Sequence, residues 1–177
     1  MQATQTFFTP PTQIAQTIRG EVSDATSRYG IHLNWSGSRI EGRLGGWWFP
    51  EQLSLERSPH GLIGYVTSRS IHLTVNVTLA DARLELLIAS HGFTETMNLE
   101  LSDAPSGVWF ERSGQHTSIQ FEQTATGWTL LAANRRVTLS AASSPDWVAV
   151  SAALVSLAAQ RAVSSAMLES LRAMREQ

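Results

Sequence analysis

Histidine is the residue type in this chain best suited to binding a metal, and five histidines are spread along it. They are His32, His60, His72, His91 and His116. No two lie three or four residues apart, the spacing that places a ligand pair on one face of a helix, and there is no cysteine to assist them. His32 and His72 each stand between Ile and Leu, so they would form a two-histidine half-site only if their strands paired. We therefore expect no metal site and no cofactor.

Residues for other kinds of catalysis are present, but not in the arrangements that catalysis requires. Serine is abundant, yet the Gly-x-Ser-x-Gly turn of many serine hydrolases is absent. Gly42–Gly46 lacks the strand-loop-helix context of a phosphate-binding loop, so its glycines indicate a bulge, a bend or a close backbone approach. Six glutamates lie at polar positions of predicted strands, where solvated side chains and glycosidase carboxylates would both occur: Glu41, Glu56, Glu85, Glu100, Glu111 and Glu122. The pattern favours a protein that is not an enzyme.

Arginine and aromatic residues are interleaved between residues 35 and 69. Such a mixture on a small β domain is typical of surfaces that bind single-stranded nucleic acid. Neighbouring strand residues face opposite ways, so one of Trp47 and Trp48 should point outward. Glutamates in the same stretch and a net charge of −2 oppose this interpretation. Single-stranded nucleic-acid binding through Arg43, Trp47 and Trp48 is therefore an alternative, not the favoured function.

Composition bounds the class of protein. The chain has 177 residues, of which 42% are hydrophobic, and we expect one domain over residues 1–177. The absence of cysteine excludes disulfides and thiol chemistry. The first residues have neither a basic opening nor an apolar run, and we find no stretch close to the ~18 apolar residues of a membrane span. These features predict a cytoplasmic protein without a membrane partner.

From residue 31 to residue 140 apolar residues alternate with polar ones. About ten or eleven short strands are separated by turn residues, as in the linkers 36–38, 58–61 and 103–107. Linkers this short cannot make parallel crossovers, so the strands should form an antiparallel meander. We predict a mainly β fold, either a barrel or a sandwich.

A closed barrel would open a further alternative, because a barrel of eight or more strands can enclose a small molecule. Trp109, Phe110, Phe121 and Trp128 are the residues that would line such a cavity. A filled sandwich core has the same pattern in sequence. A carrier of a small apolar ligand is thus our second alternative function.

Helices are predicted on both sides of this β region. Ile14, Ile18, Val22, Ala25 and Tyr29 recur at helical spacing and predict a helix over residues 12–29, ended by Gly30 in a left-handed conformation. A longer helix is predicted over residues 145–175, which contain no glycine and no proline after Pro145. Its start would have Ser144 as N-cap, Pro145 in the first position and Asp146 at the positive end of the helix dipole.

The long helix carries the main functional hypothesis. Trp147, Val150, Leu154 and Leu157 form one apolar stripe that should pack on the sheet. A second apolar stripe is rotated from the first and must either fold back by a kink or face another chain: Val163, Met167, Leu168, Leu171 and Met174. We therefore expect a binding or assembly module that forms homo-oligomers through this helix, with the chain itself as its partner.

Overall fold

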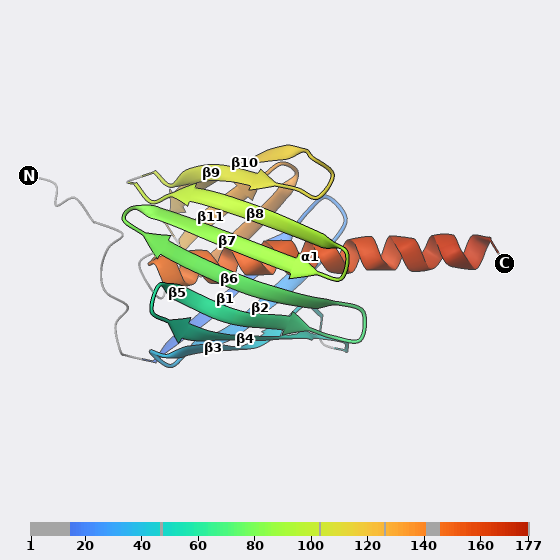
Figure 1. Ribbon diagram of the computed structural model, residues 1–177, viewed down its shortest axis with the longest axis horizontal. Coiled ribbons are helices and arrows are strands. Elements are labelled where there is room, and N and C mark those ends of the chain that lie inside the picture. The colour runs from blue at the N-terminus through green and yellow to red at the C-terminus, as the bar shows by residue number, and fades with distance from the viewer. Residues whose placement is uncertain (1–14, 47, 103, 126, 141–145, 177) are drawn as a thin grey trace, which may run out of the picture.

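The computed structural model describes residues 15–46, 48–102, 104–125, 127–140 and 146–176. They form a closed barrel of antiparallel strands with one helix running through it (Figure 1). The elements are β1 (Gln16–Ser23), β2 (Arg28–Trp35), β3 (Arg39–Leu44), β4 (Glu51–Ser58), β5 (Gly61–Thr67), β6 (His72–Ala80), β7 (Arg83–Ser90), β8 (Phe93–Glu100), β9 (Ser106–Phe110), β10 (His116–Thr124), β11 (Gly127–Ala132), β12 (Arg135–Ser140) and α1 (Trp147–Arg175).

The sheet has the simplest order that an antiparallel barrel allows. Each strand pairs with the strands before and after it in the chain, and β1 pairs with β12 to close the ring. The predicted antiparallel meander is confirmed, and the choice between barrel and sandwich is decided in favour of the barrel. The β region is also longer than predicted, because it begins at Gln16 and contains twelve strands.

The helix predicted over residues 12–29 is wrong in the part that the structure describes. Residues 16–23 form β1, and residues 28 and 29 open β2, whereas residues 12–14 lie outside the described residues. Ile18 and Val22 are four residues apart, a spacing that places two side chains on one face of a helix and equally on one face of a strand. Both are buried inside the barrel.

Two glycines explain why this segment is a strand. Gly20 faces the barrel interior between Ile18 and Val22, and a Cβ on it would lie 2.1 Å from the carbonyl oxygen of Thr138 in β12. Gly30 lies within β2 and pairs with Glu21 of β1, so it does not end a helix. Closure of the barrel through β1 therefore overrides the local helical pattern.

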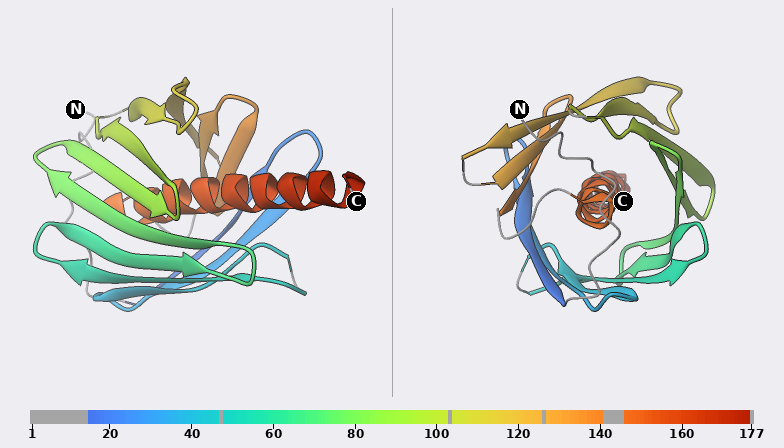
Figure 2. Two further views of the ribbon diagram at one scale, coloured as in Figure 1. Left: turned by 45° about the vertical axis from the view of Figure 1, so that its right-hand side comes forward. Right: turned by 90° about the vertical axis from the view of Figure 1, so that its left-hand side faces the viewer.

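Twelve strands enclose more space than inward side chains alone can fill. With strands about 4.8 Å apart and tilted by about 40°, the wall has a radius of about 12 Å. Eight strands already make an interior that side chains just fill. A helix, about 10 Å across, fits the remaining space, and the end-on view shows α1 near the centre of the ring (Figure 2).

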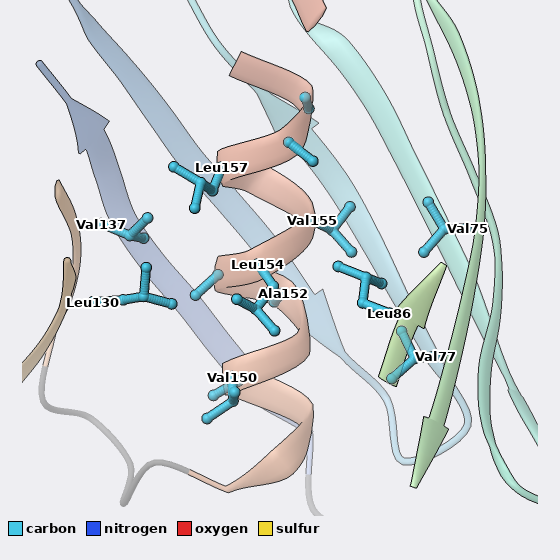
Figure 3. Close-up of a cluster of buried hydrophobic side chains, with 14 of the residues drawn as sticks. Val75, Val77, Leu86, Leu130, Val137, Val150, Ala152, Leu154, Val155 and Leu157 are labelled. Carbon is cyan, nitrogen blue, oxygen red and sulfur yellow. The ribbon is translucent and has the colours of Figure 1, made fainter. Parts of the chain in front are cut away.

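The first half of α1 is buried on every side. All residues from Trp147 to Gln160 are buried, and these fourteen residues span about 21 Å. Strands of about eight residues with the same tilt make a barrel about 20 Å high. The prediction that this half packs on the sheet through one stripe is therefore incomplete, because this half of the helix is buried on all sides and fills the barrel from end to end. Leu86 and Val75 face it from one side, and Leu130 and Val137 from the other (Figure 3).

Small residues allow the helix to fit. Alanine and serine make up half of the buried segment: Ala149, Ser151, Ala152, Ala153, Ser156, Ala158 and Ala159. The two buried hydroxyls are satisfied within the helix, because Ser151 donates to the carbonyl of Trp147 at 2.6 Å and Ser156 to that of Ala152 at 2.7 Å.

The start and course of the helix differ in detail from the prediction. The N-cap is Asp146, whose Oδ1 accepts a hydrogen bond from the amide of Ala149 at 2.8 Å. Ser144 and Pro145, the predicted cap and first residue, lie outside the described residues. The long helix itself is confirmed, and it continues through Arg175 as a single element.

One property of α1 was not anticipated. Its length and composition are sufficient for a membrane span, although 72% of the most apolar 18-residue window is buried inside the molecule. A helix that is buried on all sides needs apolar residues all round it, and this produces the same composition.

Candidate functional site

The end of the barrel from which α1 emerges gathers most of the features that bear on function. We call this end the helix mouth. Its rim consists of the loops 24–27, 45–50, 68–71, 91–92, 111–115 and 133–134, which join alternate strand pairs. The helix leaves the barrel here and projects beyond it (Figures 1 and 2).

Four of the five residues predicted for self-association project from the helix mouth. Met167, Leu168, Leu171 and Met174 have exposed fractions between 48% and 65%. We call these four the exposed stripe. The fifth, Val163, is half-buried and packs against the barrel core. The alternative that the helix kinks back is not realised, so the exposed stripe faces solvent on a straight continuation of the core helix.

Gln160 is the last fully buried residue of α1 and holds one side of the helix at the mouth. Its Oε1 accepts a hydrogen bond from Nε of Arg135 at 2.9 Å, and its Nε2 donates to Oδ2 of Asp24 at 3.2 Å. Hydrogen bonds to Asp24, chiefly from the amide of Thr26, lower the pKa of that carboxyl to about 2. Gln160 thus links the helix to β12 and to the β1–β2 loop.

Arg161 holds a second side of the helix, about 100° around the axis from Gln160. Its guanidinium forms ion pairs with Glu95 at 2.9 Å and with Glu111 at 3.2 Å, and both carboxylates are largely buried. It also lies over the ring of Trp109, 4.8 Å from the centroid. Trp109 Nε1 and the amide of Arg112 donate to Glu95, each at 3.1 Å. The cluster is therefore a satisfied buried ion-pair network and leaves its carboxylates no evident catalytic freedom.

A groove of about 740 Å³ lies between α1 and the rim of β6, β7 and β8. Its apolar floor includes Ile71, Leu73 and Ile88, and its edges carry His72 and His91. The ion pair between Arg112 and Glu169, at 3.6 Å, borders it on the helix side.

The groove and the exposed stripe lie on opposite faces of α1. The groove is lined by helix positions such as Ala158, Ala162 and Ser165. At 100° per residue, these positions point about 180° away from Met167, Leu171 and Met174. The exposed stripe therefore faces away from the groove. The charged residues Glu169 and Arg172 lie on the other face of the helix.

The residues predicted for nucleic-acid binding lie near the same mouth. Trp48 is 85% exposed and its neighbour Phe49 is 78% exposed, both in the β3–β4 loop. Trp47 lies outside the described residues. Arg43 is exposed near the end of β3 and pairs in register with His32 and Gln52. The outward tryptophan predicted for this segment is thus found, at the rim of the barrel.

Other residues singled out in the sequence are not brought together. His32 lies in β2 and His72 in β6, which are not neighbours in the ring, and no group of three metal-ligating side chains occurs among the described residues. Of the four aromatic residues predicted to line a cavity, Trp109 and Trp128 are buried and Phe110 is partly exposed. Phe121 stacks against Trp128 at 5.0 Å and packs against the core. Helix α1 occupies the interior that such a cavity would have used.

A buried pair that the sequence did not suggest lies between β2 and β4. Tyr29 and Glu51 both point into the barrel close to the helix mouth and are more than nine-tenths buried. Burial raises the pKa of the Glu51 carboxyl. Burial and the nearby Glu51 charge raise the pKa of the Tyr29 hydroxyl. Neither Tyr29 Oη nor Glu51 Oε2 has a hydrogen-bond partner within the described parts of the chain.

The anchoring residues at the mouth were missed for a specific reason. Gln160 and Arg161 end a run of small and apolar residues, a signal that marks where a buried helix meets solvent. Their partners Asp24, Glu95 and Arg135 are 25 to 136 residues away in the chain, and only the strand order brings them together.

Comparison of the chain with protein-family models, with curated proteins and with solved structures finds no match.

Proposed function

We propose that this protein is a non-enzymatic assembly module that self-associates through the projecting end of α1. The barrel serves as a rigid holder, and the last turns of the helix serve as the contact surface. The observation that carries this proposal is the exposed stripe: four large apolar side chains, all solvent-exposed, on a helix that the barrel cannot cover.

The holding contacts support this role. Gln160 and Arg161 fix the helix to two separate parts of the rim just before it emerges. A helix that is held in this way loses little further conformational freedom when its end binds a partner. The low charge of the chain, 16% of residues, further reduces repulsion between copies.

Light scattering coupled to size-exclusion chromatography tests the proposal at micromolar concentration. We expect the wild-type chain to have a mass above 19.4 kDa and the double variant Leu171→Glu/Met174→Glu to have the mass of a monomer. Both residues are exposed, so the variant should unfold at the wild-type temperature. A wild-type chain that is strictly monomeric, or a variant of unchanged mass, would overturn the proposal.

A second candidate function rests on the groove. Its 740 Å³ volume, apolar floor and histidine-bearing edge suit a small amphipathic molecule, which would be carried beside α1 instead of inside the filled barrel. Binding of the fluorescent probe ANS tests this idea: Ala162→Phe should abolish binding, and Leu171→Glu should leave it unchanged. Equal ANS binding by both variants would exclude the groove as the binding site.

A further inference from the structure

We infer that the self-association surface is two-part: two projecting helices pair antiparallel, and the tip of each seats against Trp48 and Phe49 on the rim of the other copy. This inference rests on the proposed self-association and adds its geometry and its second contact. The β3–β4 loop, which holds both aromatic residues, and the exposed stripe lie at the same end of the molecule.

The size of the barrel excludes a parallel pair. Packed helices lie 8–10 Å apart, but the barrel wall that surrounds each helix has a radius of about 12 Å. Two straight parallel helices would therefore drive the two barrels into each other. An antiparallel pair places the barrels at opposite ends, where they do not collide.

The antiparallel register follows from the spacing of the exposed stripe. If the two-fold axis passes between Ser170 and Leu171, Met167 lies opposite Met174 of the partner subunit. In this register Met167, Leu171 and Met174 of the two copies cover one another along the projecting segment, which from residue 167 to residue 176 is about 15 Å long.

The same register brings each tip to the rim of the other barrel. A partner helix 8–10 Å from the axis stands almost above the barrel wall, and its residue 176 reaches the level of residue 165, about 3 Å beyond Val163, where α1 emerges. The stripe faces away from the groove, so the partner arrives on the side opposite β6–β8. The strand order places β1 and β2 on that side. The β3–β4 loop is the next loop along the rim from the β1–β2 loop, and it presents its two aromatic side chains beside the arriving partner.

Surface area favours this two-part contact over the stripe alone. The three Met and Leu side chains that face the partner contribute on the order of 100 Å² each, so the stripes would bury about 600 Å² in total. This is below the 1,200–2,000 Å² of a stable specific interface. One Trp and one Phe per chain add about 150–200 Å² each and bring the total to about 1,300 Å². Tyrosine and tryptophan are also the residues that most often anchor interfaces.

Thiol cross-linking can test the geometry cleanly, because the chain has no cysteine of its own. We expect Met167→Cys and Met174→Cys chains to form a disulfide-linked dimer when mixed and oxidised. Met174→Cys alone should not, because antiparallel pairing separates the two copies of residue 174 by about 10 Å along the axis, beyond the reach of a disulfide. Efficient dimerisation of Met174→Cys alone would indicate parallel helices and overturn the inference.

A second mixture tests the contact between tip and rim. Gly46 is exposed, and a Cβ on it would meet no atom within 4 Å. We expect Gly46→Cys and Met174→Cys chains to be linked by a short bismaleimide only when they are mixed. Gly92→Cys, on a loop bordering the groove, is the matched control and should not be linked. Equal linkage at both positions would overturn the rim contact.

Sedimentation equilibrium separates failure of this inference from failure of the proposed function. Trp48→Ser/Phe49→Ser should raise the dissociation constant of the dimer at least tenfold. Ile63→Ser/Leu87→Ser, on the outer wall, should not change it. If Leu171→Glu/Met174→Glu gives a monomer but the Trp48/Phe49 variant associates normally, self-association is supported and the rim contact is refuted. If the wild-type chain is monomeric and its tryptophan fluorescence is quenched by oligo(dT) or by anionic vesicles, both self-association and the rim contact are refuted.

Discussion

At the scale of single residues, Glu51 is the most informative group inside the barrel. Its carboxyl is buried beside Tyr29, and burial raises its pKa. The folded chain therefore holds this proton more tightly than the unfolded chain does. Such a group stabilises the fold at a pH below the pKa of the unfolded state, and that contribution is lost as the pH rises through the folded-state pKa.

Glu51→Gln should consequently raise the unfolding temperature at pH 8, by about 2–4 °C for each kcal/mol gained in a chain of this size. The advantage should shrink as the pH is lowered toward 4, where the wild-type carboxyl is protonated. Thermal unfolding followed by circular dichroism at several pH values measures this. Glu122→Gln, at an exposed position of β10, is the control, and a pH-independent effect of Glu51→Gln would contradict the explanation.

Gly64 illustrates a different residue-scale constraint, the close approach of two strands. It lies in β5 opposite Leu55 of β4, and a Cβ on it would lie 1.9 Å from the carbonyl oxygen of Ser54. Gly42 in β3 meets His32 in the same way, at 2.1 Å. The sequence-based interpretation of the Gly42 segment as a close backbone approach is confirmed.

We predict that Gly64→Ala lowers the free energy of unfolding by about 1–3 kcal/mol, the usual cost of overpacking. Gly46→Ala should have little effect, since a Cβ there meets no neighbour. Urea denaturation of the two variants provides the comparison. Equal stability of both would show that the strands yield easily at Gly64.

At the scale of elements, the stability of α1 within the barrel depends on the charge cluster at the mouth. Glu95 accepts from Arg161, from Trp109 and from the amide of Arg112. Removing the cation from this site would leave two largely buried carboxylates without their positive partner, which is more costly than removing a whole pair.

Arg161→Met should therefore lower the free energy of unfolding by about 3–5 kcal/mol. Adding Glu95→Gln and Glu111→Gln to it should recover part of the loss, because no unpaired charge then remains. Arg112→Met, which breaks the exposed pair with Glu169 and the contact of the guanidinium with the Phe93 ring, should cost only about 1 kcal/mol. Denaturant titration of these variants tests the order, and a loss from Arg161→Met no larger than that from Arg112→Met would contradict it.

At the scale of the whole molecule, the structure divides α1 into a part that stabilises the fold and a part that does not. Residues 147–160 are buried, and residues 167–176 are exposed. A chain that ends at Ala166 should therefore unfold within about 2 °C of the full-length protein and yet be monomeric. Calorimetry and light scattering on the same sample measure both. A large loss of stability would show that the projecting turns are part of the core.

Much of this architecture is accessible from local pattern. Alternation of apolar residues predicts the strands, short linkers require antiparallel neighbours, and the absence of Gly and Pro after Pro145 predicts the long helix. The apolar stripe near the end of the helix also follows from periodicity alone. These features depend on interactions between residues that are close in the chain.

Three decisions needed the tertiary structure. Residues 16–23 and 28–29 are strand because β12 pairs with β1 across 113 or more residues, and four-residue spacing cannot distinguish helix from strand. The sheet closed into a barrel, and the helix entered it, because twelve strands enclose a space that only another element can fill. The same closure brought Glu95, Asp24 and Arg135 to the helix mouth, where distant residues together determine how much of α1 is left exposed.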